Sequence, residues 1–140
     1  MRDLTVLGEG STPVEESGTV YEAAGGMTFF VALVDHFYAG VAGDPILLAI
    51  YPEPDDLTGA RHRLSLFLAQ YWGGPRTYDD ERGHPRLRMR HAPFPIGPAE
   101  RDAWLGHMRA AVDALDPKPA VRERLSAYFE SVAEGMRNRP

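Results

Sequence analysis

ARHRLSLFLAQY, residues 60–71, carries the pattern that decides the fold. Its apolar residues are separated by four, three, one and three positions, which places them along one face of an α-helix. The same spacing returns in residues 104–115 and 121–132. The three stripes are Ala60, Leu64, Phe67, Leu68 and Tyr71; Trp104, Met108, Ala111, Val112 and Leu115; and Val121, Leu125, Tyr128, Phe129 and Val132.

Residues that stop and start helices flank the three stripes. A Gly-Gly-Pro triplet at residues 73–75 follows the first stripe, Pro98 precedes the second, and Pro117 and Pro119 separate the second from the third. Glycine ends helices, and proline is well accommodated in a first helical turn. The pattern therefore predicts three amphipathic helices, with a long connection over residues 73–97.

Two further helices are predicted upstream of the first stripe. An apolar stretch runs over residues 27–41, and Asp44-Pro45 begins a short helix that ends near Tyr51. The sequence has no comparable run of alternating β-branched residues, the pattern of a strand. We therefore predict an all-α fold.

Length and composition are those of one globular domain. The chain has 140 residues, and we predict a domain over residues 19–140 preceded by a flexible tail, residues 1–18, that is rich in Gly, Ser, Thr and Glu. The absence of cysteine excludes disulfides and thiolate chemistry. No apolar segment approaches membrane-spanning length, so we expect a cytoplasmic protein without a membrane partner. The net charge of −5 counts against a nucleic-acid partner.

The stretch RGHPRLRMRHAPF, residues 82–94, is the most unusual part of the long connection. Arginines alternate with apolar residues from Arg86 to Arg90, and His91 follows. Three interpretations are open: a solvated edge strand, a basic patch for nucleic acid, or a frame that holds one histidine. The sequence has no hydrolase, phosphate-loop or paired-histidine metal motif. By itself, His91 is more often an ordinary histidine than a ligand.

Tyr38, Tyr51 and Trp104 would each be an ordinary core aromatic with a polar tip if considered singly. Together with one isolated histidine beside arginines, they form the set that a haem pocket requires. Iron needs a neutral imidazole oriented by a second hydrogen bond, and the two propionates need guanidinium or phenol donors. The porphyrin needs apolar walls, for which the sequence offers Leu64, Phe67 and Leu68 on one side, and Met89 and Phe94 near the histidine.

The sequence resembles the group II, or O-type, truncated haemoglobins over nearly its whole length from Thr19. The resemblance is strongest in FLAQYWGGPRTY (residues 67–78), RGHPRLRMRHAPF (82–94) and ERDAWL (100–105), and TVYEAAGG (19–26) matches the family's first helix and glycine pair. It implies a globin-like two-over-two helical sandwich around one haem b. It also implies that residues 86–90 form a short proximal helix instead of a strand.

The resemblance implies a role for each candidate residue. His91 matches the axial iron ligand, and Tyr38, Tyr51 and Trp104 match the distal hydrogen-bond donors. Ala60 falls where other globins often carry a distal histidine, with Leu64 one turn further on, and Pro54 looks like a one-residue insertion after Tyr51. The positions that reach the porphyrin edge or propionates are Arg63 and Tyr78, with Arg90 as a further candidate.

Three functional hypotheses follow from this site. Several donors above the iron favour tight binding and slow release of dioxygen, and the same site accepts carbon monoxide, nitric oxide, peroxide or sulfide. That behaviour fits bulk oxygen transport poorly. The second hypothesis is a redox enzyme, a nitric oxide dioxygenase or peroxidase served by an unidentified reductase. The third and weakest is a haem-free helical protein that binds nucleic acid. The sequence leaves open whether the chain forms a homo-oligomer.

Overall fold

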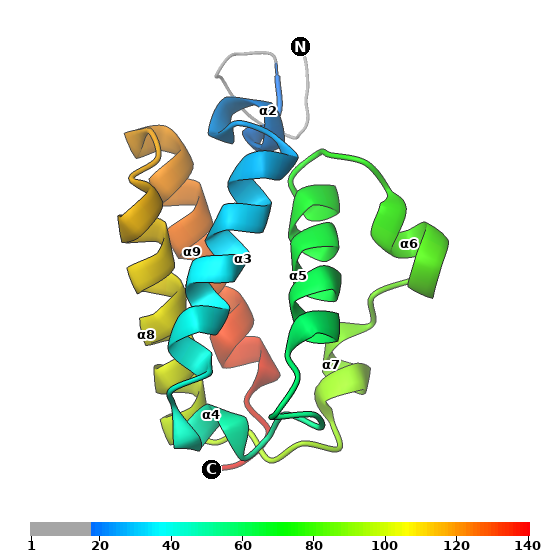
Figure 1. Cartoon of the computed structure of the whole chain (residues 1–140), viewed down its shortest axis with the longest axis vertical. Helices are drawn as coiled ribbons and strands as arrows, with labels where there is room; N and C mark the ends of the chain where they lie inside the picture. The colour runs from blue at the N-terminus through cyan, green and yellow to red at the C-terminus, as the bar shows by residue number, and fades with distance from the viewer. Residues whose placement is uncertain (1–17) are drawn as a thin grey trace.

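Figure 1 shows the computed structural model of the chain, which describes residues 18–140. The predicted tail lies almost entirely in residues 1–17, outside the described part. The described residues form eight helices and no strand, which confirms the all-α prediction. The helices are α2 (Val20–Ala24), α3 (Met27–Val41), α4 (Pro45–Leu48), α5 (Thr58–Tyr71), α6 (Thr77–Arg82), α7 (Leu87–His91), α8 (Pro98–Leu115) and α9 (Pro119–Met136).

Four long helices make the body of the molecule. α3 packs against both α5 and α8, and α8 packs against α9. In Figure 1, α8 and α9 run side by side on one flank of α3, and α5 runs on the other. The α3–α5 pair thus lies on the α8–α9 pair, which confirms the expected two-over-two arrangement.

The core lies where α3 meets the α8–α9 pair. The side chains of Phe30, Leu33, Phe37 and Val41 are fully buried, because α3 is apolar on most of its surface. Burial of one such side chain stabilises the fold by about 1.5–3 kcal/mol. The stripes predicted for α8 and α9 face this core, with Met108, Val112, Leu125 and Phe129 all buried.

The predicted short helix, α4, begins as expected and ends earlier. Asp44 caps it, because its Oδ1 accepts the backbone N–H of Ile46 at 2.9 Å, and Pro45 occupies the first turn. The helix ends at Leu48, not near Tyr51. Between Leu48 and Tyr51 the chain forms turns instead, in which the Tyr51 N–H donates a hydrogen bond to the Leu48 carbonyl at 3.3 Å.

The connection over residues 73–97 contains two short helices, where the sequence pattern indicated a long irregular segment. α7 confirms the helix that the family resemblance implies at residues 86–90. α6 was not predicted, since its sequence TYDDER has no apolar stripe. It is fixed by a contact distant in sequence: Gln70 donates from Nε2 to the Asp79 carboxylate at 2.9 Å and accepts the Asp79 N–H at 3.0 Å.

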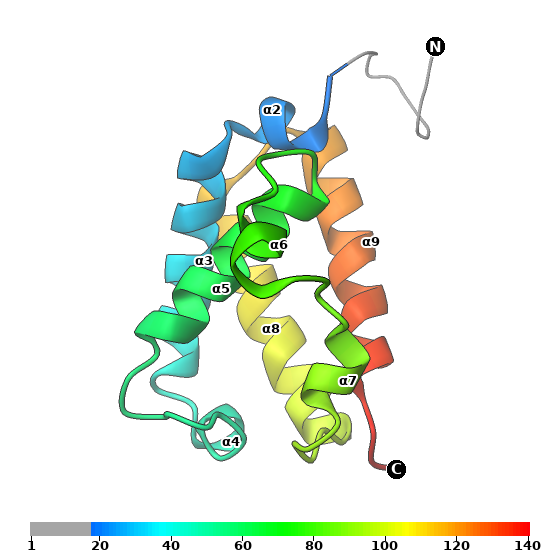
Figure 2. The ribbon, with the colours of Figure 1, turned by 90° about the vertical axis from the view of Figure 1, so that its right-hand side faces the viewer.

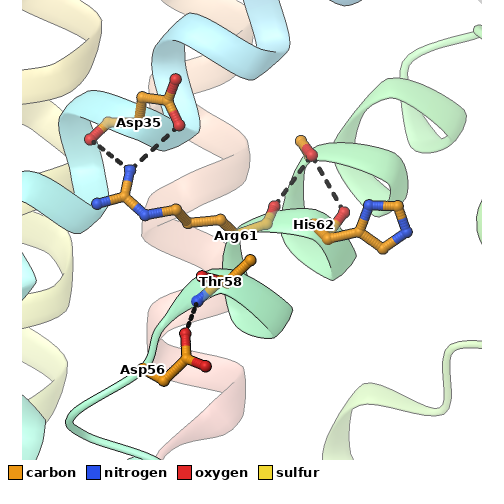
Figure 3. A network of polar contacts seen from close by, with 6 residues as sticks. Asp35, Asp56, Thr58, Arg61 and His62 are labelled. Carbon is orange, nitrogen blue, oxygen red and sulfur yellow. Dashed lines mark hydrogen bonds and ion pairs between the residues drawn. The ribbon is translucent and has the colours of Figure 1, made fainter.

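A polar network holds α5 against α3 (Figure 3). Arg61 donates from Nη1 to the Asp35 carboxylate at 3.1 Å and to the Asp35 carbonyl at 3.4 Å. Within α5, the Ser65 hydroxyl donates to the carbonyls of Arg61 and His62 at 3.0 and 3.1 Å. These contacts fix the first turns of α5.

Candidate functional site

A cavity of about 460 Å³ opens between the helices. All helices from α3 to α9 contribute residues to its lining. Figure 2 shows α3, α4 and α5 on one side and α7 and α9 on the other, with α8 between them. The predicted residues that line it are Tyr38, Tyr51, Ala60, Arg63, Leu64, Phe67, Tyr78, Arg90, His91, Phe94 and Trp104. Segments far apart in the sequence thus place these residues on one cavity.

His91 is the last residue of α7 and is partly buried. Its Nδ1 lies 2.6 Å from the carbonyl oxygen of Leu87, one helical turn earlier. A carbonyl oxygen only accepts, so Nδ1 carries the proton and donates this hydrogen bond. In the neutral ring, Nε2 then holds the free lone pair. This bond fixes both the ring orientation and the tautomer, which is the arrangement required of a metal-ligating histidine.

Side chains from distant segments anchor the residues around His91. Asn138 donates from Nδ2 to the carbonyls of Phe94 at 2.9 Å and His91 at 3.4 Å, and its Oδ1 accepts the Ile96 N–H at 2.9 Å. Arg90 donates from Nη2 to the Arg82 carbonyl at 3.0 Å. These polar contacts tie the end of the short helix to the Arg82 carbonyl before it and to Asn138, beyond α9.

Two phenols lie together on the other side of the cavity. The Tyr51 hydroxyl donates to the Tyr38 hydroxyl across 3.4 Å, and the two rings meet edge to face at 5.8 Å. Burial raises the pKa of both Tyr38 and Tyr51, well above the ordinary value for Tyr51. Both hydroxyls therefore keep their protons at neutral pH, and the Tyr38 proton is free to point into the cavity.

Trp104 presents an indole ring to the same cavity from α8. The ring packs edge to face against Phe37 at 5.5 Å and Phe129 at 5.9 Å. These two neighbours belong to the core, so they restrict the rotation of the indole. Among the described residues, no acceptor bonds the Trp104 N–H, which leaves it available to a ligand.

Arginines gather where the cavity meets α5, α6 and α7. Arg63, Arg82 and Arg90 all contribute to the lining. The Nε–H of Arg90 is buried and has no hydrogen-bond partner in the described structure. A buried donor without an acceptor costs about 1–3 kcal/mol, and more when it is charged. An anionic group inside the cavity would satisfy this donor.

The family described as bacterial-like globin matches residues 19–138. The chain belongs to this family. The group 2 truncated hemoglobin YjbI of Bacillus subtilis is 44% identical over 118 residues, covering 84% of this chain and 87% of that protein.

Solved globin structures agree with the fold of the chain. A thermostable hemoglobin of Thermobifida fusca superposes with a TM-score of 0.85 at 55% identity, covering 88% of this chain and 99% of that one. The group II truncated hemoglobin of Bacillus anthracis gives a TM-score of 0.84 at 40% identity, covering 90% and 95%. The expected assignment to the group II truncated haemoglobins is confirmed.

Globins bind haem, and the cavity of this globin fits that group. Its walls are mostly apolar, as a porphyrin requires, and one histidine offers a single free nitrogen. The unpartnered Nε–H of Arg90 suits a propionate carboxylate, which is the anionic part of haem.

Two predicted wall residues of the globin do not line the cavity. The side chain of Met89 is 59% exposed, and that of Leu68 is buried within the core. Met89 precedes His91 by two positions, so the two side chains leave the helix about 200° apart around its axis. The expectation that Met89 forms a wall near the histidine is therefore wrong, and so is the placement of Leu68 in the cavity wall.

Several lining residues of the globin were missed by sequence reasoning. Ala133 and Met136 follow Phe129 by four and seven positions, so a longer reading of the α9 stripe would have found them. Asn138 gave no signal, because its importance rests on contacts with residues more than 40 positions away. The other missed lining residues are Leu47, Ile50, Pro52, Arg82, Leu87, Ile96, Glu100 and Arg101.

Within residues 18–140, no helix combines the length and apolar character needed to cross a membrane.

Proposed function

We propose that this globin binds dioxygen tightly and releases it slowly, at a haem b whose iron is held by Nε2 of His91. The observation that carries the proposal is the shared cavity: one histidine with a single free nitrogen on one side, and three polar-tipped aromatics on the other. A structural relative from Bacillus subtilis, described as a truncated oxygen-avid haemoglobin, supports it, with a TM-score of 0.81 at 43% identity covering 86% of this chain and 100% of that one.

The side chains of the cavity divide into those that would hold the haem and those that would contact its ligand. His91 would hold the iron through its free ring nitrogen, while Arg63, Tyr78 and Arg90 would hold the carboxylate edge. Phe67, Phe94 and Leu64 provide apolar walls. When bound, haem supplies the iron centre that takes up diatomic ligands such as dioxygen, carbon monoxide or nitric oxide.

Tyr38, Tyr51 and Trp104 meet the ligand in this proposal. Tyr51 donates to Tyr38, which orders the pair and leaves the Tyr38 hydroxyl proton and the Trp104 N–H as the two donors for a ligand. A hydrogen bond to a charged acceptor contributes about 1.5–3 kcal/mol. Two such bonds to a ligand that gains negative charge slow its escape by roughly 10²–10⁴-fold, since 1.4 kcal/mol corresponds to tenfold. Ala60 adds no donor.

One set of absorption spectra tests the proposal. Purified protein, reconstituted with haem where necessary, is measured as isolated, after dithionite and after carbon monoxide. We expect an intense Soret band, a five-coordinate ferrous spectrum, and a sharp shift with carbon monoxide. Stopped-flow displacement of dioxygen then gives the release rate. A protein that fails to retain haem contradicts the cofactor assignment, and a fast release rate contradicts the role of the Tyr38 hydroxyl and the Trp104 N–H as ligand donors.

A second candidate function is oxidative turnover at the same site, as a nitric oxide dioxygenase or a peroxidase. The arginine-rich segment beside His91 favours it, because such turnover needs electrons from a partner protein and this segment offers a charged surface next to the cavity. The decay of the oxygenated protein on mixing with nitric oxide, and peroxide-dependent dye oxidation, distinguish turnover from reversible binding.

A further inference from the structure

Arg86 and Arg88 have no role in the cavity, and their surroundings are unusual. Residues 82–99 contain four arginines and no aspartate or glutamate. Elsewhere in the described chain, arginines commonly pair with carboxylates, as Arg61, Arg109 and Arg122 do. Arg82, Arg86, Arg88 and Arg90 have no carboxylate within 4.0 Å in residues 18–140. A concentrated positive surface thus exists on a chain whose net charge is −5.

A mostly apolar groove lies beside Arg88. This second cavity of about 310 Å³ is lined by Arg88, Met89 and Ala92 and by residues 135–138, at and just after the end of α9. The Met89 side chain is 59% exposed. An exposed methionine with arginines around it matches the composition of protein interfaces, where Met and Arg are enriched and the rim is polar.

The groove and the haem cavity share one wall. Met136 lines both cavities, and α7 contributes His91 to one and Met89 to the other. A partner seated in the groove would therefore be separated from the haem cavity by little more than one layer of side chains. The surface is also preformed, since Arg90 and Asn138 tie α7 to its neighbours on both sides.

We propose that Arg86, Arg88 and Met89, with the groove beside Met136, form the docking surface for an acidic electron-carrier protein that holds a reduced flavin or an iron–sulfur cluster. This inference rests on the proposed function. The carrier loses one electron, the ferric haem iron becomes ferrous, and no atom is transferred. The exposed methionine of the docking surface favours a protein partner over nucleic acid, as does the net charge of the chain.

The test compares two double variants with equal loss of charge. Arg86→Gln/Arg88→Gln removes two positive charges from the docking surface. Arg109→Gln/Arg124→Gln removes two exposed charges that line neither cavity. The haem-loaded proteins are titrated with an acidic flavodoxin, and separately with an acidic [2Fe–2S] ferredoxin, at low and high ionic strength. Reduction of the ferric haem by each reduced carrier is followed by stopped flow, with dithionite as the small-molecule control.

We expect the docking-surface variant to bind the better carrier about tenfold more weakly at low salt, and the control variant to stay within about twofold of the parent protein. The salt dependence of binding should become shallower in the docking-surface variant alone, because rim charges act through long-range attraction. The rate of reduction by the carrier should fall by the same factor, with reduction by dithionite unchanged.

Three outcomes overturn the inference. The parent protein binds neither carrier, or both double variants lose affinity for the carrier equally. In the third, the Arg86 and Arg88 substitutions weaken binding of duplex DNA and leave binding of both carriers unchanged. The haem spectrum separates this failure from failure of the proposed function. A normal spectrum with no effect of the substitutions removes only the docking surface, whereas a protein that holds no haem overturns both.

Discussion

The two sides of the cavity are held in different ways. Tyr38 and Trp104 belong to helices of 15 and 18 residues that pack in the core, and their neighbour Phe37 is fully buried. His91 ends a five-residue helix that contains no buried residue. It is held by the hydrogen bond that Asn138 donates to its carbonyl and by the one that its own Nδ1–H donates to the Leu87 carbonyl. Hydrophobic packing thus fixes the side of the cavity that carries Tyr38 and Trp104, which we call the ligand side. A few polar contacts fix the side that carries His91, the histidine side.

This contrast predicts different stabilities for the two sides. Segments with few buried apolar contacts open locally at a low free-energy cost, while core helices open only when the whole domain unfolds. α7 should therefore open more easily than α3 in the haem-free protein. A group that binds only the closed form stabilises that form by mass action, so haem should rigidify α7 far more than α3.

Among the substitutions, His91→Gly on the histidine side is expected to have the largest effect, which is on haem retention. Removal of the imidazole that lines the cavity should abolish stable haem retention, seen as loss of the Soret band after gel filtration. Added imidazole should restore a five-coordinate ferrous spectrum, because the small ligand can occupy the vacated space. His36→Gly is the control, since His36 is exposed and does not line the cavity. Normal haem retention by His91→Gly without imidazole would make the assignment of this ligand wrong.

A smaller effect is expected on the ligand side, from Trp104→Phe. The variant keeps most of the ring and its packing against Phe37 and Phe129, and it loses one N–H donor. Haem should be retained, and dioxygen should dissociate about tenfold or more faster in stopped-flow displacement.

The matched control for Trp104→Phe is the same substitution at the other tryptophan, Trp72. That residue is buried away from the cavity, and its own N–H has no partner in the described structure. Trp72→Phe should leave the dissociation rate unchanged. Equal rates in all three proteins would mean that the tyrosines alone stabilise the ligand.

The same contrast explains how much of the fold was predictable from the sequence. The long helices were predicted because each repeats a strong apolar spacing, and α3 spans the apolar stretch over residues 27–41. α6 was not predictable, since the pairing of Gln70 with Asp79 stabilises it and no local pattern reports that pairing. The early end of α4 likewise depends on turn hydrogen bonds at Ile50 and Tyr51.

For the site, the residues alone pointed to a haem pocket and left residues 82–94 open between an edge strand, a basic patch for nucleic acid and a frame for one histidine. The family resemblance resolved that ambiguity, and α7 confirms it. Met89 was misplaced because an alternating pattern does not reveal which residues share a helix face until the helix itself is known. Asn138 could not be found, because a single asparagine near a chain end carries no information about distant carbonyl groups.

A third prediction sharpens the contrast at the polar support of α7. Asn138→Ala removes three hydrogen bonds and leaves the N–H of Ile96, a buried residue, without its acceptor, at a cost of about 1–3 kcal/mol. Haem transfer to an acceptor apoprotein should become about tenfold faster, and amide hydrogen exchange in α7 should rise more than in α3. Asn138→Asp keeps a side-chain oxygen that accepts the Ile96 N–H, so haem transfer and hydrogen exchange in α7 should increase less than in Asn138→Ala. Equal increases of exchange in both helices would contradict the local role of Asn138.

The smallest effect concerns a polar tie on the side of the cavity formed by α3, α4 and α8, between Asp44 and His107. The Asp44 carboxylate lies 2.7 Å from Nε2 of His107, which joins the start of α4 to α8. Gly40 makes room for it, because a Cβ there would lie 2.4 Å from Nδ1 of His107. The tie fixes the start of the short helix that leads to Tyr51.

The hydrogen bond from His107, together with the Ile46 N–H, lowers the pKa of Asp44 below its usual value of 3.8. A carboxylate with a lowered pKa in the folded state stabilises the fold above its unfolded pKa, and this contribution disappears as the pH falls through the folded value. At pH 7 the urea midpoint of unfolding should therefore be higher for the parent protein than for the Asp44→Asn variant. This difference in midpoint should shrink below about pH 4. Because core packing holds the rest of this side, dioxygen release should change little. A difference in midpoint that stays constant from pH 7 to pH 3 would show that the charge of Asp44 does not contribute to this tie.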